Sequence, residues 1–284
     1  MSSKAGHGLT GNRLIEMTTR LRATGESRVA PYLTAGDGGL DLTLELLRAM
    51  EDAGAGCVEL GVPFSDPIAD GPTLQAAAER SLEAGTTLDG IERTVRAFRD
   101  GGGTVPILAF SYVNPLLSGG AAGGLNRRFA SLRKAGFDGV LIPDLPIEEA
   151  PGLAALAENH GLCTTLFCAP TTADDRLKRA AEATRGFLYV VGRTGVTGAN
   201  TEVSQTSESY LQRVRSLSGE TPLGVGFGIR TAAQVAAVSE HAELAIVGSA
   251  LVAAIHEAGS TSAGDPTASA VEAACRFMAS LTAG

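Results

Sequence analysis

Short apolar runs alternate with longer amphipathic segments along nearly the whole chain of 284 residues. About eight such runs occur, at residues 28–36, 56–62, 104–112, 138–144, 163–170, 186–193, 222–229 and 243–250. Each run is nearly continuous in apolar character, which is typical of a strand buried on both faces of a parallel sheet. The segments between the runs carry apolar residues at three- and four-residue spacing, which indicates helices. This alternation limits the chain to folds in which helices join parallel strands.

Eight strand-then-helix units predict a single closed (β/α)8 TIM barrel, with residues 1–284 as one domain. A helix over 13–24 precedes the first strand, and 266–284 form an extra C-terminal helix. An open doubly wound sheet is the alternative, but the even length of the units and the lack of a dividing break favour the barrel. Residues 1–10 are expected to be a flexible tail, and 259–266 a flexible connection to the last helix.

The composition points to a folded protein that acts on a small molecule. Hydrophobic residues make up 44% of the chain, and the formal net charge is -8. Nucleic acids and acidic membrane surfaces need a basic face, so neither is expected as a partner. No signal-peptide core or membrane-length apolar segment occurs, which predicts a cytoplasmic protein. The four His and four Cys are too scattered to predict a metal site.

The second apolar run opens the stretch CVELGVPFSDPIADGP, residues 57–72, which contains two carboxylates of interest. Glu59 lies inside the apolar part, where an ionised side chain is costly unless it has a use. In a barrel it would lie near the carboxyl end of the second strand, where active sites of this fold form, with Asp70 in the following loop. The pair could support general acid catalysis once the loop closes. Alternatively, Glu59 pairs with a buried Arg and Asp70 is a turn residue.

The ends of the seventh and eighth predicted strands are rich in glycine. Gly226 and Gly228 belong to the first of these ends, and Gly248 precedes Ser249 at the second. Glycine lets backbone N–H groups approach an anion, and a helix beginning near Ser249 would add its positive end. We therefore predict a phosphate site here, the alternative being that the glycines only form turns or make room for packing. The segment GRTGVTGAN, residues 192–200, is expected to form a flexible lid.

Together these motifs resemble the tryptophan synthase alpha subunit family over nearly the whole chain. The strongest match is ELGVPFSDPIADGP, and the set includes PYLTAGD, SYVNP, LIPDLPIEE, GRTGVTGAN, GVGFGI and VGSAL in the family's order. The resemblance implies retro-aldol cleavage of indole-3-glycerol phosphate to indole and glyceraldehyde 3-phosphate, with no cofactor in this chain. It also implies a tryptophan synthase beta subunit as partner in an alpha2-beta2 complex, with pyridoxal phosphate on the beta subunit.

The resemblance also assigns roles to individual residues. Glu59 would perform the proton transfers, and Asp70 would hold the indole N–H. The substrate-binding residues would be Tyr32, Phe110, Tyr112, Leu141, Tyr189 and Thr197, and the phosphate-binding residues Gly198, Phe227, Gly228, Gly248 and Ser249. Core packing is the alternative for Phe110 and Leu141. The partner surface would involve the 66–70 loop, the segment after Tyr112 and the region of Pro146.

Other functions compete with that of a synthase subunit. A stand-alone lyase that releases free indole would need the same two carboxylates. A non-catalytic subunit that only activates a partner would have no chemical reason to keep the carboxylates and the phosphate glycines together. A Schiff-base aldolase is disfavoured, because Lys4 lies in the tail and Lys134 and Lys178 lie in helical patterns rather than at the barrel mouth.

Overall fold

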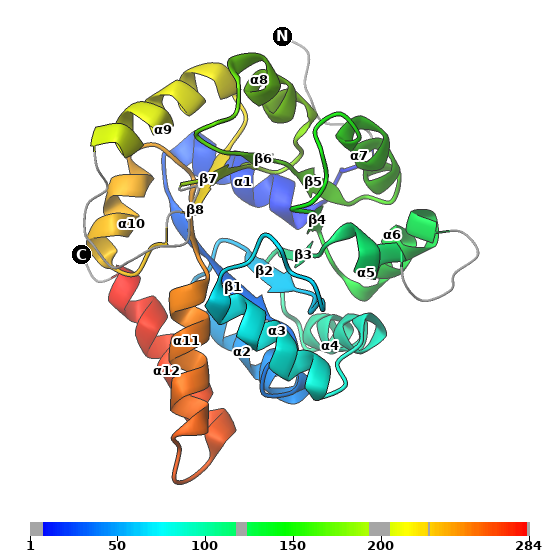
Figure 1. The fold of residues 1–284 in the computed structure, drawn as a ribbon, viewed down its shortest axis with the longest axis vertical. Helices are drawn as coiled ribbons and strands as arrows, with labels where there is room; N and C mark the ends of the chain where they lie inside the picture. The colour runs from blue at the N-terminus through cyan, green and yellow to red at the C-terminus, as the bar shows by residue number, and fades with distance from the viewer. Residues whose placement is uncertain (1–7, 118–123, 193–204, 227, 283–284) are drawn as a thin grey trace.

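The computed structural model describes residues 8–117, 124–192, 205–226 and 228–282. Its nine described strands form one parallel sheet in the order β5-β4-β3-β2-β1-β9-β8-β7-β6. Helices surround this ring of strands on its outer side (Figure 1). Parallel strands need a crossover between each pair, and the helices supply it.

The bounds of the elements agree with the alternation seen in the sequence. In the described residues the strands are β1 (Arg28–Thr34), β2 (Val58–Gly61), β3 (Ile107–Phe110), β4 (Gly139–Leu141), β5 (Cys163–Thr165), β6 (Phe167–Cys168), β7 (Leu188–Val191), β8 (Leu223–Gly226) and β9 (Leu244–Val247). The helices are α1 (Arg13–Thr24), α2 (Leu40–Asp52), α3 (Pro72–Glu83), α4 (Leu88–Asp100), α5 (Val113–Leu117), α6 (Gly124–Ala135), α7 (Ala150–Asn159), α8 (Asp174–Ala183), α9 (Gln205–Ser218), α10 (Ala232–Ser239), α11 (Ser249–Ser260) and α12 (Pro266–Thr282).

The fifth apolar run is divided at Leu166, which gives nine strands where about eight were expected. β5 pairs with β4 and β6 pairs with β7, so the two ends of the strand order are consecutive pieces of one chain segment. The carbonyl of Leu166 accepts a hydrogen bond from the N–H of Tyr189 at 2.8 Å, across this junction. The sheet therefore closes, which confirms the barrel and contradicts the open-sheet alternative.

The extra helices at both ends of the chain also occur as predicted. α1 begins after Asn12, whose side-chain oxygen accepts hydrogen bonds from the N–H groups of Leu14 and Ile15. Leu9 is buried, so residues just before α1 belong to the packed structure, whereas residues 1–7 lie outside the described part. In the connection before α12, Asp265 accepts hydrogen bonds from the N–H groups of Thr267 and Ala268. Whether 259–266 is flexible stays a prediction.

Alternate residues of each strand face opposite sides of the barrel wall. Side chains that point outward, such as Val58 and Leu60, pack with the surrounding helices in the largest apolar cluster. Side chains that point inward form a separate cluster that includes Leu108 and Leu141, and Leu14, Met17 and Leu21 of α1 join it. α1 therefore covers one end of the barrel, and the site can form only at the other end (Figure 1).

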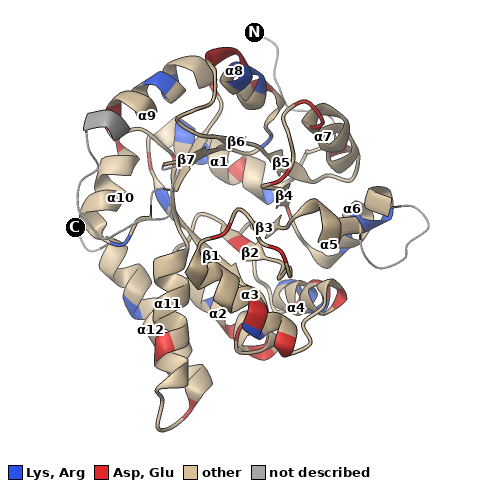
Figure 2. Cartoon of the chain, viewed as in Figure 1, with Lys and Arg blue, Asp and Glu red and all other residues tan. Residues whose placement is uncertain are grey.

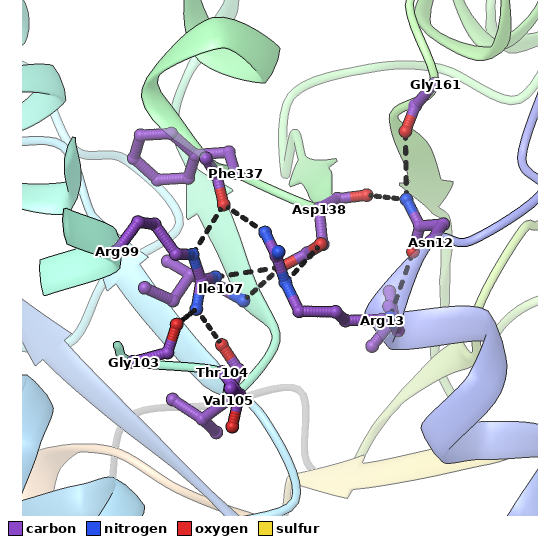
Figure 3. Close-up of polar contacts among 12 residues, drawn as sticks. Asn12, Arg13, Arg99, Gly103, Thr104, Val105, Ile107, Phe137, Asp138 and Gly161 are labelled. Atoms are coloured by element: carbon purple, nitrogen blue, oxygen red, sulfur yellow. Dashed lines mark hydrogen bonds and ion pairs between the residues drawn. The ribbon is translucent and has the colours of Figure 1, made fainter. Parts of the chain in front are cut away.

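Two buried carboxylates hold α1 at the amino-terminal end of the barrel. Asp138, next to the start of β4, accepts hydrogen bonds from Arg13 of α1 at 3.2 Å, Arg99 of α4 at 3.0 Å and the N–H of Ile107 at 3.0 Å (Figure 3). Glu243, next to the start of β9, makes a comparable set of contacts. It accepts from Arg22 at the other end of α1, from Arg215 of α9 and from the N–H of Leu223. Both ends of α1 are thus tied to the strands.

Charges of both signs are spread over the outer helices, as on α4 and α8 (Figure 2). Such mixed surfaces are typical of solvated helix faces rather than of a binding face for a polyanion. Within the described ranges, no helix is both long and apolar enough to cross a membrane.

We predict that Asp138→Ala lowers the free energy of unfolding by about 3–5 kcal/mol, because it leaves two partly buried arginines and the buried Ile107 N–H without their acceptor. The measurement is urea denaturation followed by circular dichroism. The matched control is Asp89→Ala, which removes a carboxylate that is 74% exposed and paired with Arg128, and it should cost less than about 1 kcal/mol. Equal losses in the two variants would contradict the structural role given to Asp138.

Candidate active site

The open end of the barrel is formed by the carboxyl ends of the strands, and Glu59 of β2 lies just inside it. Interior side chains of such a barrel form layers contributed by alternate strands. The strand registers place Glu59 in one layer with Leu141 of β4, Tyr189 of β7 and Ile246 of β9. The next layer toward the mouth contains Tyr32, Phe110, Phe167 and Gly226. Glu59 therefore lies among apolar and aromatic neighbours.

Glu59 is 0% exposed, and neither of its carboxyl oxygens has a hydrogen-bond partner among the described residues. Burial without a compensating charge disfavours the ionised form and raises the pKa of Glu59 well above its usual value of 4.5. The alternative of a structural ion pair is not supported, because none of the described arginines pairs with Glu59. A protonated carboxyl at this position can donate a proton to a bound molecule.

Asp70 lies in the connection between β2 and α3 and is held by Tyr112. The Tyr112 hydroxyl donates to Oδ2 of Asp70 at 3.1 Å and accepts from the N–H of Ala69 at 2.9 Å. Burial raises the pKa of Asp70 above its ordinary value, while the hydrogen bond from Tyr112 lowers it. The sequence thus placed both carboxylates correctly at the mouth, and the structure gives them different surroundings.

Tyr112 itself is fixed by the strand ends on either side of it. The N–H of Ser111 donates to the carbonyl of Leu141 at 2.9 Å, and the N–H of Val113 donates to Asp144 at 3.0 Å. The Tyr112 ring also packs on Phe64, with 5.3 Å between ring centroids. Tyr112 can therefore position the loop that carries Asp70 from a rigid base.

Four aromatic rings follow one another around the mouth. Tyr32 contacts Phe110 edge to face at 5.4 Å, Phe110 contacts Phe167 at 6.3 Å, and Phe167 contacts Tyr189 at 4.8 Å between centroids. Phe167 was not identified from the sequence. The signal that could have found it is its even spacing from the inward-facing Cys163 in the same run.

The predicted substrate-binding residues differ in how far they are exposed. Leu141 is completely buried in the interior cluster, which agrees with the core-packing alternative. Phe110 and Tyr189 are only half-buried and pack at the edge of the same cluster, where a bound molecule can reach them. Tyr32 is buried, with its hydroxyl directed toward Gly61.

The predicted phosphate residues that the structure describes lie together at the ends of two neighbouring strands. β8 pairs with β9 through Gly224 and Leu244. Gly228 and Gly248 each follow their paired residue by the same number of positions, so they lie at the same end of the two strands. Gly228 has a φ of 68°, in the left-handed region that favours glycine. Gly248 is the N-cap of α11, and no side chain caps the first turn of this helix. The N–H groups of the first turn, which begins at Ser249, can therefore bind an anion.

Three predicted site residues, Thr197, Gly198 and Phe227, lie outside the described residues, as does most of the expected lid at 192–200. Within the part of the chain that the structure describes, no group of His, Cys, Asp and Glu is arranged to hold a metal ion. The described site therefore offers a buried acid, a more accessible carboxylate, an aromatic wall and a set of backbone donors. This combination suits proton transfer on a substrate with a flat apolar part and an anionic end.

Comparison with known proteins gives one consistent family. The family whose model matches residues 18–282 is described as "Tryptophan synthase alpha chain". The tryptophan synthase alpha chain of Roseiflexus castenholzii is 44% identical over 246 residues, which cover 87% of this chain and 92% of the relative. The alpha chain of Chloroflexus aggregans is 45% identical over 241 residues, covering 85% and 88%.

Solved structures agree with these relatives. The tryptophan synthase subunit alpha of Legionella pneumophila has a TM-score of 0.82 and 33% identity, covering 95% of this chain and 98% of the other. A chain in the tryptophan synthase a2b2 complex of Pyrococcus furiosus has a TM-score of 0.78 and 33% identity, covering 90% and 98%.

We predict that Tyr112→Phe raises the pKa of Asp70, because the variant loses the hydrogen bond that stabilises the carboxylate. The pKa can be measured by carbon-13 NMR of the carboxyl groups, with Asp70→Asn used to assign the signal. Tyr210→Phe is the matched control, since its hydroxyl contacts Cys168 rather than a carboxylate. An Asp70 pKa that is unchanged or lower in Tyr112→Phe would show that Tyr112 does not act on Asp70.

Proposed function

The chain belongs to the tryptophan synthase alpha chain family, and from that membership we propose how its own residues carry out the family's reaction. The chain is a lyase of tryptophan biosynthesis that cleaves indole-3-glycerol phosphate to indole and glyceraldehyde 3-phosphate. The observation that carries the proposal is the pairing of two unlike carboxylates at one barrel mouth. Glu59 is buried without a partner, and Asp70 is held by a hydroxyl donor.

Glu59 performs both proton transfers in this proposal. Its protonated carboxyl donates a proton to indole C3, which places a positive charge on the indole ring. The resulting carboxylate then takes the proton from the adjacent glycerol hydroxyl. As that oxygen becomes the aldehyde carbonyl, the carbon–carbon bond breaks and its electron pair returns to the ring, so Glu59 ends protonated as it began. A rigid position on β2 keeps the carboxyl aligned with both atoms.

Asp70 stabilises the charge that develops during the reaction. As a carboxylate it accepts a hydrogen bond from the indole N–H and interacts favourably with the positive ring. Tyr112 keeps Asp70 ionised at lower pH by donating a hydrogen bond to it. Activity therefore requires protonated Glu59 and ionised Asp70. It falls as pH rises through the pKa of Glu59 and as pH falls through the pKa of Asp70.

The remaining residues bind the two ends of the substrate. Tyr32, Phe110, Phe167 and Tyr189 contact the indole ring from one side of the mouth, and Leu141 forms the floor beneath it. The phosphate binds to backbone N–H groups at Gly228, Gly248 and Ser249, where the positive end of α11 also points. Thr197, Gly198 and Phe227 are assigned to the lid and the phosphate site by the family resemblance alone.

The partner is a tryptophan synthase beta subunit, as in the a2b2 complex of Pyrococcus furiosus. We propose that the beta subunit carries pyridoxal phosphate and that both proteins work in the cytoplasm. Docking is supported by two exposed apolar side chains near the mouth, Ile68 in the β2–α3 connection at 83% and Leu117 of α5 at 50% exposure. Both side chains follow the carboxyl ends of their strands, and a partner that covers this end of the barrel would remove their apolar surface from water.

We predict that Glu59→Gln lowers indole release from indole-3-glycerol phosphate by about a hundredfold or more, because it removes the proton donor. Substrate binding, measured by titration calorimetry, should be retained, since the amide has nearly the same size. Glu92→Gln is the matched control: that carboxyl is also buried, but it pairs with Arg128 and Ser131 away from the mouth. Near-normal turnover by Glu59→Gln would overturn the mechanism.

The same assay, repeated with a tryptophan synthase beta subunit present, separates the synthase subunit from the stand-alone lyase. Indole release by the wild-type chain should increase when the partner is added, because docking near the Asp70 loop favours its closed state. Rapid release that does not change with the partner would instead identify a stand-alone lyase.

A further inference from the structure

Gly61, the last residue of β2, lies against the ring of Tyr32. A Cβ added at Gly61 would be 2.0 Å from the Tyr32 hydroxyl oxygen, 2.5 Å from Cζ and 2.9 Å from Cε2. Gly61 is not among the glycines with positive φ, so its backbone conformation does not require glycine. The requirement is one of space: only a residue without a side chain lets the Tyr32 ring cross β2 at this point.

Tyr32 cannot easily move away from this position. Its ring packs edge to face on Phe110 at 5.4 Å and contacts Ala77 of α3 and Val252 of α11. Such packing leaves the ring little free space, so movement of the ring would have to disturb its neighbours. A side chain at position 61 would therefore displace the ring rather than meet a flexible group.

The ring covers Glu59 from the direction of the mouth. Tyr32 and Glu59 are partners in the register of β1 and β2, and both face the interior. Gly61 follows Glu59 on the same face of β2, one interior position nearer the mouth. A ring that reaches from Tyr32 to Gly61 thus passes over Glu59 on its solvent side. This agrees with the 0% exposure of Glu59 beneath an open barrel end.

We propose that Gly61 is a positioning residue for the reaction: by admitting the Tyr32 ring across β2, it keeps water away from Glu59 and so keeps Glu59 available as a proton donor. The inference rests on the proposed function and names a residue that the sequence patterns did not assign. Glu59 owes its raised pKa to burial alone, so the group that completes this burial controls its protonation.

Among the residues that the structure describes, the other titratable groups near Glu59 stay neutral over the same pH range. They are Tyr32 of β1, Cys57 next to the start of β2 and Tyr189 of β7, and burial raises the pKa of each. Asp70 also interacts with Tyr32 and Tyr189. Because the reaction requires ionised Asp70, protonation of Asp70 affects the acidic limb of the pH profile and not the alkaline limb. The alkaline limb of the pH profile therefore reports Glu59.

The test is the pH dependence of kcat for indole release by Gly61→Ala. Displacement of the ring lets water reach Glu59 and lowers its pKa, so the alkaline limb should move to lower pH. A shift of one unit would reduce kcat about tenfold on that limb. In the Tyr32→Leu background the ring is already absent, so Gly61→Ala should produce no further shift. Tyr32→Leu alone should move the limb in the same direction, which provides a test even if Gly61→Ala does not fold.

Gly103→Ala is the matched control, because its Cβ would meet the ring of Phe98 at 2.3 Å, away from the mouth. It should destabilise the chain without moving the pH profile. An unchanged alkaline limb in both Gly61→Ala and Tyr32→Leu would overturn the inference, as would a full additional shift in the double variant. If Glu59→Gln is inactive while the limb does not move, this inference fails alone; if Glu59→Gln is active, the proposed function fails first.

Discussion

The burial of one carboxyl group without a partner is the constraint on which the site depends. Glu59 has no exposed surface and no hydrogen-bond partner among the described residues. Such a group is stable only in its neutral form, since an ionised carboxylate in apolar surroundings is costly. The barrel provides these surroundings through Leu141, Tyr189 and Ile246 at the same level and Tyr32 above. Burial of a carboxyl group without partners destabilises the fold locally, but it provides the neutral acid that proton transfer to carbon requires.

The carboxylates at the two ends of the barrel differ in the number of their hydrogen-bond partners. At the closed end, Asp138 and Glu243 each accept from two arginines and a backbone N–H, which ties α1 to the strands. At the mouth, Glu59 is left without partners and Asp70 receives a single hydroxyl donor among the described residues. The hydrogen bonds at the closed end therefore stabilise the barrel. The same rigid strands hold the site at the mouth, whose own polar groups are incompletely satisfied.

The sequence predicted the barrel well because its main signal is local. The run of apolar segments and the helix over 13–24 both follow from periodicity, and they recur in the structure. The break at Leu166 could not be predicted, because it depends on how one segment pairs with different neighbours on its two sides. The contact of Gly61 with Tyr32 was missed for a similar reason, whereas the even spacing of Phe167 from Cys163 was a local signal that was not used. A glycine that makes room for a side chain of another strand looks, in sequence, like any other glycine.

Burial keeps Glu59 protonated at pH values where an exposed glutamate is ionised, and infrared spectroscopy can observe this protonation state directly. The wild-type spectrum minus that of Glu59→Gln isolates the C=O stretch of the Glu59 carboxylic acid, and the band can be followed as pH is raised. The protonated band should persist well above the ordinary pKa of 4.5, because burial disfavours the ionised form of Glu59. Loss of the band close to that ordinary value would show that Glu59 ionises in the folded protein like an exposed glutamate, so burial would not keep it protonated.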